Sequence, residues 1–134
     1  MTTVAIERTA DEDDWLLRPT RLWSRAEDQS GAIAALRDRG AGAIVVTLGA
    51  AGARLVPRQG EPTLVHAYSV DVVDTTAAGD AFVAAFAVAL AEALSPVEAL
   101  VRGNAAGALT VTQPGAQPSL PTRDEVDAWL RAHP

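Results

Sequence analysis

Residues 29–39 and 43–48 restrict the fold of this chain more than any other part of its sequence. Residues 43–48 read AIVVTL, a continuous and mostly β-branched run that is typical of a strand covered on both faces. The segment before it carries Ile33 and Leu36 at helical spacing and ends at Gly40, a residue type that commonly terminates helices. A helix followed by such a buried strand predicts an α/β fold.

Turn residues and helix-capping patterns predict the remaining elements. A Gly-rich turn after residue 48 leads into a second strand, expected to be antiparallel to the first, and three helices follow a third strand. Aromatic and leucine residues recur every fourth position in the first of these helices, which indicates that it is buried. Each of the other two begins with a capping box. The further strands are expected at 53–56 and 63–70, and the helices at 79–94, at 96–112 and after Thr122.

Composition excludes several classes of protein. Hydrophobic residues make up 49% of the 134 residues and charged residues 21%, which fits one compact domain rather than a disordered chain. The formal net charge of −6 argues against nucleic acids and anionic membranes as partners, because both require a basic surface. The sequence has no cysteine and two distant histidines, so neither disulfides nor a zinc site are expected. Because the first residues lack a secretory signal and residues 81–94 are too short to span a bilayer, we expect a cytoplasmic protein.

Small residues lead directly into the start of the first of these three helices. Ala77, Ala78 and Gly79 leave their backbone amides accessible to a phosphate, and amides at a helix start attract anions because they lie at its positive dipole end. Asp80 belongs to the first turn and is placed to accept a proton from a hydroxyl group that attacks this phosphate. A base beside an anion-binding site suits phosphoryl transfer, in which Mg²⁺ normally accompanies the nucleotide phosphates.

The same residues also permit a purely structural interpretation. An acid in the first turn stabilises a helix by itself, and small residues allow helices to pack closely. Because a short glycine-containing match is unspecific, the spacing alone leaves the functional and the structural interpretation open.

The run from Asp74 to Phe82, DTTAAGDAF, resembles the C-terminal signature of the ribokinase, or PfkB, family of carbohydrate kinases. The pattern of that signature is Asp, Ser/Thr, a variable residue, Gly/Ala, Ala, Gly, Asp, any residue and Phe, and every position fits. The resemblance implies that Asp80 is the catalytic base and that the backbone of Ala78 and Gly79 helps to form an anion hole.

Two further stretches resemble the nucleotide site of the same family. Residues 46–52 read VTLGAAG and look like the strand and turn that line the nucleotide. Asn104 occupies a position that lies beside the adenine in ribokinases, with an ordinary amide on a helix surface as the alternative. The resemblance therefore implies that ATP is bound by Thr47, Leu48, Gly49, Ala50, Ala51, Gly52, Ala78, Gly79 and Asn104.

A third stretch, residues 110–121, is similar to the tail of ribokinases, in which a Gly-Ala-Gln-Pro-Ser run and nearby carbonyls hold a monovalent cation. Backbone carbonyls and a carboxylate are suitable hard ligands for such an ion. The alternative is that the prolines and the glycine only form an ordered connector. The resemblance implies a K⁺ site at Asp74, Thr76, Thr110, Gln113, Gly115 and Ser119.

The resemblance implies a ribokinase-like three-layer α/β/α sandwich of which only the C-terminal part is expected here, with the lid and the N-terminal half absent. We expect residues 29–134 to form the nucleotide-binding part and residues 1–28 to be a poorly matched segment. The family's Gly-Gly sugar-binding motif and its Asn-x-x-Glu motif are not found in the sequence. Ribose is the expected sugar, with fructose or a nucleoside as alternatives.

The missing sugar-binding motif also bears on activity. Without the residues that position a sugar, efficient turnover by this chain alone is not expected. The sequence is compatible with a kinase completed by a separate N-terminal half, with a non-catalytic ATP-binding remnant, and with a structural α/β interaction domain. Exposed edge strands would favour self-association.

Overall fold

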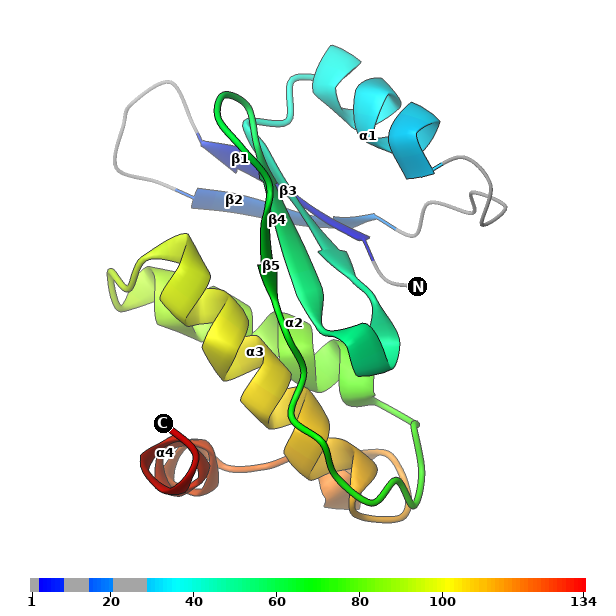
Figure 1. Ribbon diagram of the computed structural model, residues 1–134, viewed down its shortest axis with the longest axis vertical. Helices are drawn as coiled ribbons and strands as arrows, with labels where there is room; N and C mark the ends of the chain where they lie inside the picture. The colour runs from blue at the N-terminus through cyan, green and yellow to red at the C-terminus, as the bar shows by residue number, and fades with distance from the viewer. Residues whose placement is uncertain (1–2, 9–14, 21–28) are drawn as a thin grey trace.

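The computed structural model describes residues 3–8, 15–20 and 29–134, which contain one antiparallel sheet and the helices around it. The strand order is β2-β1-β3-β4-β5, so β2 and β5 are the two edges (Figure 1). Within the sheet, Val45 of β3 lies opposite Leu55 of β4. The strands are β1 Thr3–Arg8, β2 Trp15–Thr20, β3 Ala43–Thr47, β4 Ala53–Pro57 and β5 Thr63–Val65.

Helices cover both faces of the sheet. On one face, α1 (Gln29–Asp38) packs its Leu36 against Ile44 and Val46. On the other face, α2 (Ala78–Ala91) and α3 (Pro96–Val111) contribute to a core that includes Val45. Successive β3 side chains thus enter different cores, which explains why this strand is continuously apolar. The α/β/α layering predicted from the sequence is confirmed.

Local sequence signals account for the helix boundaries. Ser95 caps α3 by accepting a hydrogen bond from the Glu98 amide while the Glu98 carboxylate accepts one from the Ser95 amide. Thr122 caps α4 (Arg123–Ala132) in the same way. Both predicted capping boxes are present. In α2, Phe82 and Phe86 are buried as the four-residue spacing predicted, and their rings are stacked with centroids 6.1 Å apart.

The sheet differs from the sequence-based expectation at both ends. Strands β1 and β2 were not predicted, although β1 pairs with β3 and therefore extends the sheet. Pro19 lies in β2, where an edge position tolerates the missing amide. The strand predicted at 63–70 was too long, because β5 ends at Val65. The carbonyls of Val65 and His66 are instead bonded by the side chain of Asn104 from α3.

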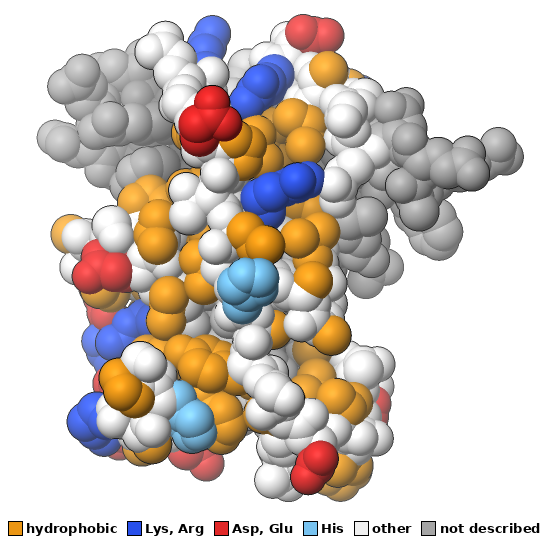
Figure 2. All heavy atoms as spheres, in the orientation of Figure 1, with side chains coloured by type: hydrophobic (Ala, Val, Ile, Leu, Met, Phe, Trp, Pro, Cys, Tyr) orange, Lys and Arg blue, Asp and Glu red, His pale blue; other side chains and the backbone are white. Residues whose placement is uncertain are grey.

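The face that carries β5 and α3 presents apolar side chains interspersed with charged ones (Figure 2). Leu64, on the edge strand β5, is 44% exposed. The self-association expected from exposed edges stays a prediction. In the part of the chain that the structure describes, no helix combines the length and the hydropathy that crossing a membrane requires.

Candidate functional site

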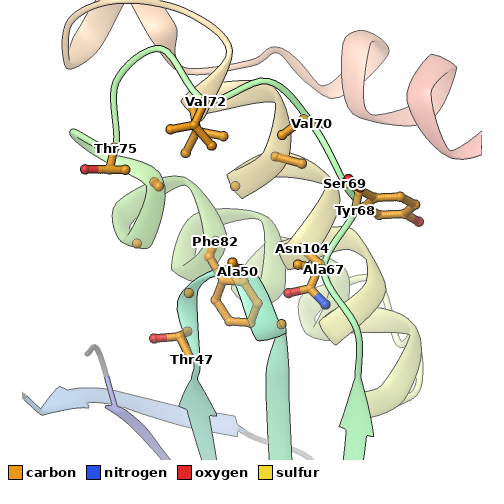
Figure 3. Close-up of a pocket in the computed structure, with 17 residues that line it drawn as sticks. Thr47, Ala50, Ala67, Tyr68, Ser69, Val70, Val72, Thr75, Phe82 and Asn104 are labelled. Carbon is orange, nitrogen blue, oxygen red and sulfur yellow. The ribbon is translucent and has the colours of Figure 1, made fainter.

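A pocket of about 540 Å³ lies where the β3–β4 turn, the start of α2 and the middle of α3 meet (Figure 3). Its remaining wall is the segment of residues 67–72, which runs from β5 toward α2. The pocket is lined by Thr47, Gly49, Ala50, Gly52, Ala67, Tyr68, Ser69, Val70, Val72, Thr75, Ala78, Gly79, Phe82, Asn104, Gly107, Ala108 and Val111. Small and apolar residues dominate this lining, as is usual for a site that binds a small molecule.

Most of the residues predicted to bind the nucleotide come together at this pocket. Leu48 and Ala51 are not among the lining residues: Leu48 packs on the opposite core with α1, and Ala51 is exposed. The predicted residues that do line the pocket are Thr47, Gly49, Ala50, Gly52, Ala78, Gly79 and Asn104. Sequence reasoning missed the wall at residues 67–72, because most of it, residues 67–70, was assigned to a strand.

The start of α2 is open toward a ligand. The residue before the helix, Ala77, has a left-handed backbone with φ of 64°, and its side chain gives no cap. The Ala78 amide donates to the Thr75 carbonyl at 3.3 Å. Among the described residues, no partner occurs for the amides of Gly79 and Asp80, so two first-turn donors remain for an anion.

Asp80 follows directly on this open helix start. It is an exposed acid in the first turn of α2, next to Gly79, which lines the pocket. Its carboxylate has no hydrogen-bond partner among the residues that the structure describes. Asp80 itself is not among the residues that line the pocket.

Asp74 ties the loop before α2 to the loop after α3. Its Oδ1 accepts hydrogen bonds from the Thr76 amide at 2.9 Å and from the Thr76 hydroxyl at 2.6 Å. Its Oδ2 accepts one from the Gly115 amide at 2.9 Å. These bonds lower the pKa of the Asp74 carboxyl below its ordinary value, and the bond from the Thr76 hydroxyl has the largest effect. The ionised carboxylate is therefore the form that holds the two loops together.

The structure brings three of the six predicted K⁺-site residues, Asp74, Thr76 and Gly115, into direct contact. The Thr110 hydroxyl donates to the Ala106 carbonyl, and the Ser119 hydroxyl donates to the Ala116 carbonyl. The Gln113 amide donates to the Thr110 carbonyl at 3.2 Å. Because N–H and O–H donors already engage the Asp74 carboxylate, oxygens for a cation would come mainly from backbone carbonyls of this loop pair. Within the described ranges, no cluster of three or more acidic, His or Cys residues could hold a metal ion.

Comparisons with known proteins show the family and the fold of this chain. A sequence model described as pfkB family carbohydrate kinase matches residues 10–123. The chain belongs to this family. The ribokinase of Haemophilus influenzae is 44% identical over 107 residues, which cover 78% of this chain and 35% of the relative. This pfkB-family chain therefore spans about a third of the length of such ribokinases.

Solved structures show the same fold. An Arabidopsis thaliana ribokinase complexed with ribose and ATP superposes with a TM-score of 0.72 at 38% identity, covering 81% of this chain and 35% of that one. The phosphofructokinase-2 of Escherichia coli, in complex with potassium, superposes with a TM-score of 0.65 at 27% identity. The match covers 84% of this chain and 36% of that one. The family thus includes proteins named for different sugars.

Proposed function

We propose that this chain supplies the nucleotide pocket and the catalytic base of an ATP-dependent carbohydrate kinase. The observation that carries the proposal is a pocket lined by both predicted glycine-containing motifs, with two amides at the start of α2 that have no partner among the described residues. In this arrangement the adenosine part of ATP occupies the pocket, and its phosphates reach the amides of Gly79 and Asp80. Ribose is the proposed acceptor, since relatives over this region include ribokinases. Fructose and nucleosides are the alternatives.

The proposed reaction uses Asp80 as the general base. Its carboxylate takes the proton of the sugar hydroxyl while the hydroxyl oxygen forms a bond to the γ-phosphorus of ATP. The bond from that phosphorus to the β–γ bridging oxygen breaks, and ADP leaves. The amides of Gly79 and Asp80 stabilise charge on the transferred phosphoryl group. Mg²⁺ would arrive with the ATP phosphates and neutralise part of their charge.

The proposed K⁺ site belongs to the loops that Asp74 joins. Carbonyl oxygens from the loop before α2 and from residues 110–119 are suitable ligands for a monovalent cation. A cation there would stiffen the loop that presents the amides of the anion hole. The identity of the ion and a cytoplasmic location stay predictions.

The length of the chain favours a second candidate. Since the chain spans about a third of the Haemophilus influenzae ribokinase, residues that position a sugar would come from a region corresponding to the rest of that relative. A chain that binds ATP without transferring its phosphate is therefore the alternative to a complemented kinase.

We expect the 134-residue chain to bind Mg-ATP weakly, because the pocket and both free amides are formed without other parts of a kinase. The dissociation constant is expected at about 0.1–1 mM, as for a ligand held by one half of its site. Isothermal titration calorimetry measures it directly. Ribose phosphorylation should be negligible until a chain carrying the remaining two-thirds of a pfkB-family kinase is added.

Two outcomes would contradict this proposal. Absence of heat at millimolar Mg-ATP would show that the pocket does not take the nucleotide. Rapid ribose phosphorylation by the purified chain alone would show that the sugar site is present here. If ATP binds and the complemented assembly stays inactive, the non-catalytic alternative is favoured.

A further inference from the structure

The wall of the pocket at residues 67–72, here called the strap, has an unusual connection to the rest of the fold. The strap contributes Ala67, Tyr68, Ser69, Val70 and Val72 to the pocket lining. It belongs to neither a helix nor a strand, and no backbone–backbone hydrogen bond is made by its residues within the described part of the chain. Its position must therefore be set by what holds its two ends and its side chains.

The far end of the strap is attached to the end of α3. Immediately after the strap, the amides of Val73 and Asp74 both donate to the Val111 carbonyl, at 2.7 and 3.2 Å. The Gly115 amide adds a hydrogen bond to the Asp74 carboxylate. Near the beginning of the strap, the ring of Tyr68 meets Trp129 of α4 edge to face, with centroids 5.7 Å apart.

The near end follows the pairing of β5 with β4 and is held in addition by one side chain from α3. Asn104, in the middle of α3 and only 6% exposed, donates from Nδ2 to the Val65 carbonyl at 3.0 Å and to the His66 carbonyl at 3.1 Å. These are the last two carbonyls before the strap. The two acceptors also fix the orientation of the amide, because the reverse orientation would set its oxygen against two carbonyl oxygens.

The nitrogen and the oxygen of the Asn104 amide therefore have different environments. Both of its N–H donors point at the backbone before the strap. Its Oδ1 has no partner among the described residues, and in Figure 3 it is turned to the side on which Phe82 lies. Loss of the side chain would leave two carbonyls without their donor at the point where the chain leaves the sheet.

We propose that Asn104 is a positioning residue that fixes the strap in the nucleotide-free protein and thereby keeps the ATP pocket preformed. This inference rests on the proposed function only for the identity of the ligand. Asn104 is proposed to act by holding the strap in place, and this effect exists before any nucleotide binds. A residue that acted only by touching adenine would leave the empty pocket unchanged.

The variant Asn104→Asp tests the proposal with almost no change in size. Its carboxylate presents oxygens where Nδ2 now donates, so the Val65 and His66 carbonyls are repelled instead of bonded. We expect backbone NMR order parameters of residues 67–72, measured without nucleotide, to fall from about 0.85 to below about 0.6. Mg-ATP affinity should weaken by about tenfold or more, since the pocket has lost an ordered wall.

Two further variants keep this test decisive. Asn104→Ala removes the donors without adding repulsion, and it replaces the Asp variant if that protein fails to fold. Ser95→Ala weakens the same helix at its capping box, far from the strap in sequence, and is the control for lost stability. We expect Ser95→Ala to lower the unfolding midpoint and to leave the order parameters of the strap and the Mg-ATP affinity unchanged.

The outcomes separate this inference from the proposed function. Unchanged strap order parameters in both Asn104 variants would overturn the positioning role, whatever happens to ATP affinity. Loss of strap order in Ser95→Ala as well would also overturn it, because helix stability alone would then explain the effect. If the unmodified chain binds no Mg-ATP, the proposed function fails, while the measurement on the nucleotide-free strap still decides the role of Asn104.

Discussion

Replacing Gly52 by alanine is expected to lower the free energy of unfolding by about 3 kcal/mol or more. Gly52 ends the β3–β4 turn with φ of 106° and ψ of −137°, a backbone conformation that side chains rarely permit. A Cβ atom there would lie 2.1 Å from the Val65 carbonyl oxygen and 2.7 Å from the Ala67 nitrogen. Both contacts are with backbone, so neither can be relieved by a side-chain rotation.

Gly60→Ala is the matched control for this change. Gly60 has a similar φ of 97°, and a Cβ atom there would meet nothing within 4 Å. It isolates the conformational cost, expected to be about 1 kcal/mol. Urea unfolding followed by tryptophan fluorescence measures both variants. Equal losses in the two variants would show that the contact between the turn and the end of β5 does not determine the stability of this region.

Replacing Asp80 by asparagine is expected to reduce the turnover of a complemented kinase by about 10²–10⁴-fold, the usual contribution of a general base. Asparagine keeps the size of the side chain and cannot accept the proton. Mg-ATP affinity should change by less than about fivefold, because the amides of the anion hole belong to the backbone. Steady-state kinetics and calorimetry on the same preparation separate the two effects.

Asp124→Asn is the control for the change in charge. Asp124 is also an exposed acid in the first turn of a helix, α4, and it does not line the pocket. The substitution removes the same charge from an equivalent position relative to a helix dipole. Turnover should therefore stay unchanged in this variant. A complemented Asp80→Asn protein that retained turnover would exclude Asp80 as the base.

Much of the fold could be predicted because its signals are local. Each of the two capping boxes is formed within four consecutive residues, and each begins a helix at the expected position. The apolar run of β3 predicted burial on both faces, and Ile44 and Val45 enter different cores. The open start of α2 could also be predicted, since small residues and an acid at a helix start suffice to describe it.

The features that sequence reasoning missed depend on partners far away in the chain. The Asp74 carboxylate meets the Gly115 amide across 41 positions, and Asn104 meets the Val65 carbonyl across 39. No periodicity marks such contacts. Residues 67–70, which are mostly apolar, therefore looked like a continuation of β5, whereas the Asn104 amide occupies the last carbonyls and the chain leaves the sheet. No clean periodicity marked strands β1 and β2 within residues 1–28, and the pairing of β1 with β2 and with β3 was equally invisible in the sequence.

The central claim is that the free amides at the start of α2 hold the phosphates of ATP. Titration of the ¹⁵N-labelled chain with Mg-ATP, followed by amide chemical shifts, tests this claim most directly. We expect the amides of Gly79 and Asp80 to show some of the largest shifts, together with those of the Gly49–Ala51 turn, and to saturate with the same dissociation constant. Saturable shifts confined to residues outside the pocket, or none at millimolar Mg-ATP, would contradict it.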